Sequence, residues 1–336
     1  MAINFRNAMT ALFGGKRARS GTVWREVGAY TSRFLPFSGD AYANDVARAC
    51  IHTLAEHTSK ANAIIRQDPG LERLIRGRPN LYMNGKDFLY KTRTLYETNN
   101  TVFIYINRDE RGKVLSLYPI PNCPAEAVEV SGRLFIRFSF AGGEQLTASW
   151  EDLAVMRKHY NASDIFGDSN AALITSLDLM STTTQGMANA IKSTSNLRGI
   201  LKSTKAMLSD EDVKRQKDRF VADYLSLENS SGIAMLDSTV DFKPVDVKPA
   251  TAEPETIKEL RENIYRYFGV SEEAVTGKLF GDQWEAFYDS AIEPFLIALG
   301  LELTNKIYTD RQRGFGNEIM FESSRMQYMS MENKLK

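Results

Sequence analysis

Residues 254–309 read PETIKELRENIYRYFGVSEEAVTGKLFGDQWEAFYDSAIEPFLIALGLELTNKIYT. Apolar residues recur at helical spacing at both ends of this stretch, and a loop bounded by two glycines separates them. We expect a short amphipathic helix, the loop, and a longer helix that Asp282 caps, with Glu285 completing a capping box. Pro294 lies inside the longer helix, so a bend is predicted near Ser290. This arrangement is typical of a loop that is held out for contact.

The composition of the 336 residues, 43% hydrophobic and 25% charged, is typical of a globular protein with a sizeable core. Basic and acidic residues number 42 each, which excludes the strong positive field that drives tight nonspecific binding of nucleic acid. Any contact with DNA is therefore expected to be local or weak. Two cysteines are too few for a disulfide framework and predict a reducing compartment. We expect no signal peptide and no membrane-spanning segment, and residues 1–39 are predicted to be a loosely ordered arm.

The region from residue 38 to residue 166 is predicted to combine helices with an antiparallel sheet. Apolar spacing predicts one helix over residues 38–66 and a second over residues 86–98. Apolar runs between tight turns predict strands at residues 102–106, 114–117, 128–130 and 134–140. His52 and His57 come close to a zinc-protease motif. Their spacing of five residues points the two rings to different sides of a helix, so no metal site is predicted.

The helix predicted over residues 170–195 carries an apolar seam with alternating spacings of four and three residues. The seam consists of Leu173, Leu177, Met180, Thr184, Met187 and Ile191. The rest of the helix surface is rich in serine, threonine, asparagine and glutamine and poor in charge, unlike an ordinary solvated helix. Two interpretations stay open: a core helix with one polar face, or a helix that packs against copies of itself in an oligomer.

Residues 197–250 are predicted to form a small α/β insertion between two helices. Strands are expected at residues 197–201 and 232–236, and a third is considered at residues 240–247. A charged helix over residues 209–227 separates the first two strands and includes Asp210, Glu211, Lys214, Lys217 and Arg219. Its acidic start and basic continuation suit the helix dipole and a solvated outer face. A proline-containing linker then leads to Pro254.

Seven short motifs occur in an order that matches one known family. They are Arg76-Gly-Arg-Pro79-Asn80-Leu-Tyr-Met83 followed by Asp87-Phe88; Asn99-Asn100 before a strand; Leu117-Tyr-Pro119-Ile120; Glu151-Asp152-Leu153; Gly167-Asp-Ser169 opening a helix; Gly199-Ile-Leu201; and Glu259 through Phe268-Gly269-Val270. In this order they resemble the portal protein of tailed double-stranded-DNA bacteriophages, most closely the siphovirus-type branch. The resemblance extends from about Asp40 to Met326.

The resemblance implies an α+β portal-protein fold with a wing, a stem, a clip and a crown. It assigns residues 1–39 to an N-terminal arm, 40–166 to a wing of antiparallel sheet and helices, 167–196 and 251–275 to two stem helices, 197–250 to the clip, 276–282 to the tunnel loop, and 283–326 to the bent helix and a strand that returns to the wing. Residues 327–336 would begin a crown that is either minimal or cut away.

The resemblance also implies a structural role. The family forms a ring, usually of twelve subunits, at one capsid vertex, through which genomic DNA is packaged and ejected. The implied partners are further copies of the chain, the major capsid protein, the terminase large subunit, a head–tail adaptor or connector protein, and double-stranded DNA bound without sequence preference. The charged clip helix would dock the motor and the connector proteins. No membrane is implied, and the expected location is the virion after assembly in the host cytoplasm.

The implied tunnel loop comprises Thr276, Gly277, Lys278, Leu279, Phe280 and Gly281. We expect its glycines to permit a change of shape, Lys278 to contact a phosphate, and the two apolar residues to touch DNA without reading its sequence. The alternative is that Leu279 and Phe280 pack into the core of their own subunit.

No enzymatic activity, cofactor or metal site is predicted. The nearest string to a phosphate-binding loop, Gly269 to Lys278, has seven residues between its glycines instead of four and follows no strand, which excludes a Walker-type motor. The carboxylates are scattered along helices and turns, whereas a catalytic metal requires a cluster. A soluble oligomeric adaptor or binding module without a DNA channel remains the alternative function.

Overall fold

The computed structural model describes residues 25–26, 42, 44–194, 199–203, 240–244 and 254–323, with side chains for residues 42, 44–187 and 254–323. The chain divides into two compact units, one made of residues 1–177 and 261–336 and the other of residues 178–260. Most of the described residues belong to the first unit. No helix in this described part of the chain is long and apolar enough to cross a lipid bilayer.

Three helices open the described part of the first unit: α3 (Asp45–Thr58), α4 (Pro69–Gly77) and α5 (Gly85–Asn99). The side-chain oxygen of Asn44 caps α3 by accepting from the N–H of Ala47 at 3.0 Å. Asn84 and Asp87 form a capping box that starts α5, which confirms the helix predicted at residues 86–98. Helix α4 was not expected from the sequence.

The predicted helix over residues 38–66 is wrong beyond Thr58. Helix α3 ends at Thr58, and β2 (Asn62–Arg66) pairs antiparallel with β11 (Glu318–Glu322). Residues 63 and 65 are buried and their neighbours are exposed, which is the alternation of a strand. Ile64 and Ile65 fit the apolar spacing of either element, so pairing with a distant strand decided the outcome. Residues 38–41 lie outside the described residues.

The strands of the middle region form two antiparallel sheets instead of the one expected. The first contains β4 (Val114–Pro119), β3 (Thr101–Arg108) and β8 (Leu153–Arg157) in that order, and the second contains β1 (Arg25–Glu26), β5 (Ala125–Val130), β6 (Arg133–Ser139) and β7 (Gln145–Ser149). The four predicted strands are confirmed as β3 to β6. A single 3₁₀ turn, η1 (Trp150–Asp152), joins β7 to β8. Both sheets contribute to one core that includes Phe103, Ile136, Phe138, Leu153, Val155 and Phe166.

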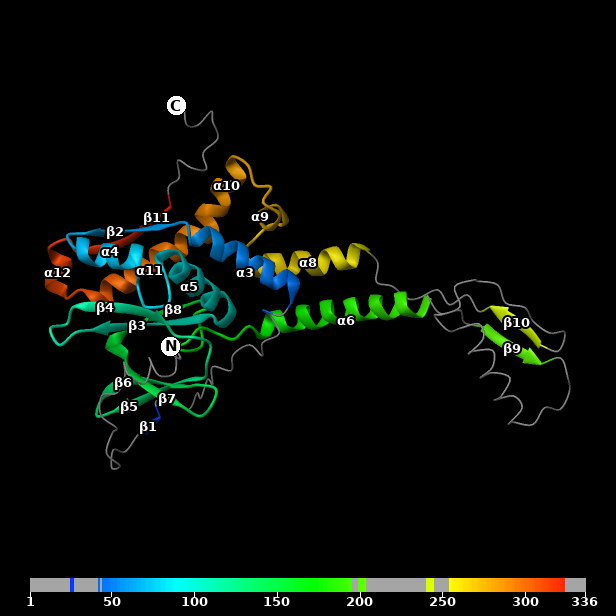
Figure 1. Cartoon of the computed structure of the whole chain (residues 1–336), viewed down its shortest axis with the longest axis horizontal. Coiled ribbons are helices and arrows are strands. Elements are labelled where there is room, and N and C mark those ends of the chain that lie inside the picture. Colours follow the sequence, from blue (N-terminus) through cyan, green and yellow to red (C-terminus); the bar gives the residue numbers. More distant parts are fainter. Residues whose placement is uncertain are drawn as a thin grey trace. The chain divides into compact units, whose positions relative to one another are not determined.

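Helix α11 (Glu293–Ile307) packs against β11 and against β8, which places it between the two-stranded β2–β11 sheet and the β4–β3–β8 sheet (Figure 1). A Cβ atom on Gly300 would lie 2.5 Å from the carbonyl oxygen of Ile319, so glycine is needed for this close approach. The hydroxyl of Thr304 accepts a 2.9 Å hydrogen bond from the N–H of Ile319. A short helix, α12 (Asp310–Gly314), leads from α11 to β11, which is a strand within residues 283–326, where one was expected.

The stretch from residue 254 to residue 307 contains more elements than were expected. Helix α8 (Pro254–Phe268) is confirmed, but the sequence analysis missed the short α9 (Glu272–Thr276), which Ser271 caps. The longer helix consists of α10 (Asp282–Phe287), a π-helical turn η2 (Tyr288–Ile292), and α11. Gly281 occupies the N-cap position of α10 and no side chain caps the helix, so the predicted capping by Asp282 and Glu285 is wrong.

The π turn lies where the bend was predicted. Pro294 has no N–H to donate to the carbonyl of Ser290, and the regular hydrogen-bond ladder is replaced there by the wider π turn. The hydroxyl of Ser290 donates to the carbonyl oxygen of Ala286 at 2.6 Å. The helix is therefore irregular at the expected place, and the irregularity is a π turn.

The second unit contains the larger part of α6 (Ala171–Thr194), the first turns of α8, and an antiparallel pair of strands. The strands are β9 (Gly199–Ser203) and β10 (Val240–Pro244), in agreement with strands expected near residues 197–201 and 240–247. The helix predicted at residues 209–227 and the strand predicted at residues 232–236 lie outside the described residues.

Candidate functional site

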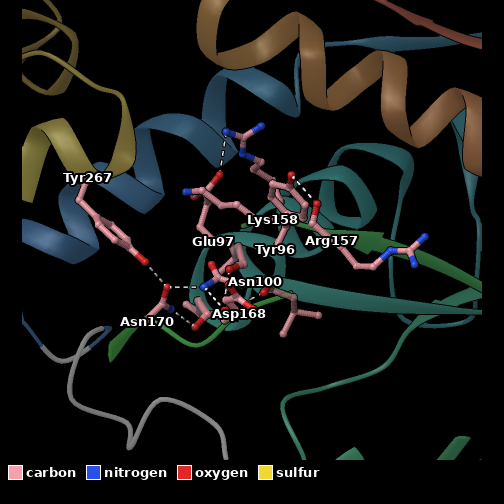
Figure 2. A network of polar contacts seen from close by, with 12 residues as sticks. Tyr96, Glu97, Asn100, Arg157, Lys158, Asp168, Asn170 and Tyr267 are labelled. Atoms are coloured by element: carbon pink, nitrogen blue, oxygen red, sulfur yellow. Dashed lines mark hydrogen bonds and ion pairs between the residues drawn. The ribbon is translucent and has the colours of Figure 1, made fainter. Parts of the chain in front are cut away.

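A buried polar junction in the first unit joins the end of α5 to the start of β3, the end of β8, the start of α6 and the end of α8 (Figure 2). Asn170, just before α6, lies at its centre. Its side-chain oxygen accepts from the amide of Asn100 at 2.6 Å and from the hydroxyl of Tyr267 at 2.5 Å, and its own amide donates to the carbonyl of Thr98 at 2.9 Å. Both asparagines are buried. One carboxamide therefore connects three separate segments of the chain.

Asn100 holds the second part of the junction. It ends α5 in the left-handed conformation, with φ of 54°, which asparagine tolerates better than most residues. Its amide also donates to the carbonyl of Asp168 at 2.7 Å, and its carbonyl accepts from the N–H of Lys158 at 2.7 Å. A Cβ atom on Gly167 would lie 2.3 Å from that same carbonyl oxygen, so only glycine fits there.

A buried set of charges lies beside these amides. Glu97 pairs with Arg93 at 2.7 Å and with Lys158 at 2.6 Å, and only 1% of the Glu97 side chain is exposed. The ammonium group of Lys158 lies 5.6 Å from the ring centre of Tyr267 and 5.5 Å from that of Phe268, at the end of α8. Burial raises the pKa of Tyr267, which keeps its hydroxyl protonated as a donor to Asn170. Charge, aromatic and amide contacts thus fix the same helix end.

The predicted loop, Thr276 to Gly281, begins at the last residue of α9 and ends just before α10. The side chain of Lys278 is exposed, Leu279 is half-buried, and 76% of Phe280 is exposed. The alternative that both apolar residues pack into the core of their own subunit is therefore wrong for Phe280. The side chains of Lys278 and Phe280 are therefore both open to solvent on this loop.

The helix after this loop is anchored by an imidazole ring. His57 of α3 lies with its ring centre 4.6 Å from that of Trp284 and 5.7 Å from that of Phe287, both on α10. Burial lowers the pKa of His57 to about 4, with a smaller contribution from the nearby charge of Lys60. The neutral ring therefore helps to hold α10, and with it one end of the loop, against α3.

The predicted seam of α6 is divided by the structure. Leu173, Leu177 and Met180 are buried within the chain, whereas Thr184 is exposed and Met187 is half-buried; the side chain of Ile191 lies outside the described residues. The buried part of the seam is thus accounted for by the chain's own packing. Two large apolar residues that the sequence analysis did not single out, Ile174 and Leu179, are 41% and 52% exposed on the same helix.

The other predicted site residues lie elsewhere. Asp210, Glu211, Lys214, Lys217 and Arg219, predicted for partner docking, are outside the described residues. His52 is bonded to the hydroxyl of Tyr90 at 2.9 Å, and the described residues contain no group of three or more histidine, cysteine or acidic side chains that could hold a metal ion.

Comparison with known proteins identifies the family. The sequence profile of the phage portal protein family matches residues 41–336. The chain belongs to this family. No match was found among curated protein sequences.

The portal fold is shared with solved structures at low sequence identity. A chain from the neck of an empty gene transfer agent particle, computed with C6 symmetry, has a TM-score of 0.71 and 16% identity, over 94% of this chain and 91% of that chain. The neck of the native particle, computed with C12 symmetry, gives 0.68 and 16% over 90% and 87%. An HK97 family phage portal protein from Corynebacterium diphtheriae gives 0.57 and 14% over 87% and 96%. These similarities show the mixed helical and antiparallel-sheet fold of portal proteins.

The family motifs included part of the junction but not its central residues. Asn99-Asn100 and Gly167-Asp-Ser169 were noted as portal motifs, and they supply Asn100 and the close approach at Gly167. Glu97, Lys158 and Asn170 were missed. Glu97 lies four residues after Arg93 in the predicted helix, a spacing that allows an ion pair, while nothing local marks Lys158 or Asn170.

We predict that Glu97→Gln destabilises this portal-family chain by about 3 kcal/mol, because it leaves the buried Arg93 and the partly buried Lys158 without a counter-charge. Denaturant unfolding followed by circular dichroism measures the change. The matched control is Glu56→Gln, which breaks an exposed pair with Lys86 and should lose less than about 1 kcal/mol. Equal losses in the two variants would contradict a structural role for the buried charges.

We also predict a histidine-dependent loss of stability in acid. The folded-state pKa of His57 is about 4 and its unfolded value is about 6.5, so the unfolded chain binds the extra proton first as pH falls. This contribution to stability is complete above about pH 6.5 and is lost progressively towards pH 4.

His57→Phe should remove this part of the pH dependence while keeping an aromatic ring against Trp284. As pH is lowered from about 7 to about 4.5, the unfolding free energy of the wild-type protein should fall relative to that of the variant. If the difference between the two proteins does not change with pH, His57 is not held neutral by its surroundings.

Proposed function

We propose that the chain is a portal subunit that forms a closed ring of identical copies at one vertex of a capsid, and that double-stranded DNA passes through the ring. The observation that carries this proposal is the match of the phage portal protein family over residues 41–336. Solved structures of similar fold come from particle necks computed with C6 and C12 symmetry, which supports a ring of twelve. The ring is a structural component of the virion and carries out no catalysis.

Two large apolar residues that are exposed in the described part of α6 support contacts between copies. Ile174 and Leu179 are five residues apart, which at 3.6 residues per turn separates them by about 140° around the helix axis. They therefore point to different sides of the helix. In a ring each subunit meets one neighbour on each side through two different surfaces, and a helix with one exposed apolar residue on each side fits this head-to-tail packing.

We assign the loop from Thr276 to Gly281 to the wall of the DNA channel. Its exposed lysine can contact phosphates and its exposed phenylalanine has no means of hydrogen bonding to DNA. One such lysine per subunit, repeated around the ring, gives a weak and salt-sensitive hold on DNA. The overall charge balance of 42 basic and 42 acidic residues keeps this hold from spreading over the whole surface.

We assign the remaining partners by the same family membership. The ring would contact the major capsid protein, and the insertion at residues 197–250 would dock the terminase large subunit during packaging and a head–tail connector protein afterwards. The charged residues from Asp210 to Arg219 are the proposed docking surface. Assembly in the host cytoplasm and a final place in the virion complete the proposal.

Native mass spectrometry tests the ring directly, and α6 offers a sharp pair of variants. The wild-type protein should give a single large oligomer. Ile174→Asp or Leu179→Asp alone should each give monomers, because each variant places a charge in one of the two surfaces that form every contact between neighbours. An equimolar mixture of the two variants should give dimers, since one copy still offers an intact Leu179 side and the other an intact Ile174 side.

The control for this experiment is Leu173→Asp, which buries a charge in the chain's own core and should unfold the protein instead of dissociating it. A wild-type protein that stays monomeric at micromolar concentration would favour the alternative of a soluble adaptor module. Single variants that remain in large oligomers would remove α6 from the contacts between copies.

The DNA assignment is tested by replacing Lys278, Leu279 and Phe280 together with glycine. Because Lys278 and Phe280 are exposed and Leu279 is half-buried, ring formation should be unchanged and the melting temperature should fall by only a few degrees, while the yield of DNA-filled capsids should drop at least about tenfold. The matched control is Phe287→Gly, which removes a buried side chain from α10 and should lower the melting temperature much more. Normal packaging by the triple variant would exclude the loop from DNA handling.

A further inference from the structure

A groove of about 630 Å³ runs along β11 and α11 on the first unit and belongs to neither the junction nor the loop. Its apolar lining includes Leu296, Ile297, Leu301 and Met320. Ile297 and Leu301 are 55% and 56% exposed, so two large aliphatic side chains of α11 face solvent in the groove that β11 also lines. An exposed apolar groove of this size marks a docking surface.

The edge of β11 in this groove has open main-chain groups. Ile319 on β11 is paired with Ile65 on β2, but neither N–H group bonds to the partner strand. The N–H of Ile319 donates to the hydroxyl of Thr304, and the N–H of Ile65 donates to the carboxylate of Glu72. They are therefore a non-hydrogen-bonded pair, and the alternation of an antiparallel ladder gives Phe321 the same outward direction. Helix α11 covers the outward carbonyl of Ile319 at Gly300, whereas within the described residues no hydrogen bond engages the outward N–H and carbonyl of Phe321. An added strand can pair there.

The rim of the groove selects for positive charge. Glu293, Glu318 and Glu322 line it, and no lysine or arginine is among the described lining residues, although Arg66 lies 3.6 Å from Glu318 just outside the groove. The occupant should therefore be an extended segment that combines apolar residues with basic ones.

Residues 324–336, SRMQYMSMENKLK, have this composition. They contain Met326, Tyr328, Met329, Met331 and Leu335, and three basic residues against one acidic residue, a net charge of +2. Methionine side chains are flexible and adapt to irregular apolar surfaces. Thirteen residues in extended form span about 43 Å, which is enough to cross an interface and still pair along β11.

We propose that the groove between α11 and β11 receives residues 324–336 of a neighbouring copy, which add a strand at Phe321 and link adjacent subunits. This inference rests on the proposed ring. The segment follows directly from Ser323, at the end of the groove, so filling its own groove would require an immediate reversal of the chain. Residues 323–326 are Ser-Ser-Arg-Met and lack the glycine, asparagine or aspartate that tight hairpin turns require. A segment that arrives from a neighbour needs no such turn.

A closed ring suits this exchange. Each copy offers one groove and one segment, and these two surfaces are different, so the contact is head to tail. In a closed ring every groove is then filled and no segment is left over. The exchange would strengthen each subunit contact without enlarging the folded part of the chain.

Disulfide trapping in the intact oligomer tests the proposal. Ile297→Cys is combined in turn with Met326→Cys, Met329→Cys and Met331→Cys, so that different registers of the segment are sampled. The two native cysteines, Cys50 and Cys123, are buried and leave the background low. Oxidation followed by denaturing electrophoresis should give a ladder of covalently linked chains for at least one pair. Leu115→Cys, equally exposed but on β4, replaces Ile297→Cys as the control and should give no ladder.

The outcomes separate this inference from the proposed function. Native mass spectrometry before oxidation establishes whether the ring is present. Rings that give no ladder, or that give only disulfides within single chains, overturn the exchange and leave the ring standing. A protein that forms no ring overturns both.

A charge-reversal variant tests whether the acidic rim attracts the segment. Lys334→Glu combined with Lys336→Glu should lower the yield of the ladder at least about threefold at low salt, because it reverses the attraction to the acidic rim. An unchanged yield would show that the acidic rim does not select the segment.

Discussion

The side-chain amide of Asn170 is the contact on which the organisation of the first unit depends. With three hydrogen bonds it fixes the first turn of α6, the last turn of α8 and the loop between α5 and β3 relative to one another. A buried amide must have its partners, since each one lost costs about 1–3 kcal/mol. Hydrogen bonds depend on both distance and direction, whereas the hydrophobic effect is non-directional. The relative positions of these three segments are therefore fixed more closely than apolar packing alone would fix them.

The charges around Glu97 make the same region rigid in a second way. Lys158 contacts the carboxylate of Glu97 and the faces of Tyr267 and Phe268, and Arg93 lies 4.6 Å from the ring centre of Phe295 on α11. The core helix α11 and the end of α8 are thus connected through one buried ion cluster.

Local patterns in the sequence were sufficient to predict the helices and strands that bury one face against the core. Strands β3 to β6 and helices α5 and α8 show a clear period of two or of 3.6, and they were predicted to within a few residues. Strand β2 could not be predicted, because Ile64 and Ile65 satisfy both periods and the partner strand lies near the other end of the chain. The glycines around Lys278 marked the loop, but the direction of Phe280 depends on α10 and its contact with His57, which no local pattern encodes. Asn170 and Lys158 were missed for a similar reason: a buried polar residue is recognisable only by partners that are remote in sequence.

The π turn at Tyr288–Ile292 contains one residue more than an α-helical turn would use. Each residue of an α-helix advances the chain by about 100° around its axis, so the turn resets the angular phase between α10 and α11 by that amount. The direction in which the loop at Lys278 faces consequently depends on the number of residues in the π turn as well as on the contacts of α10. Deletion of one residue from this turn would leave the sequence of the loop unchanged and rotate the loop by about 100° around the helix axis.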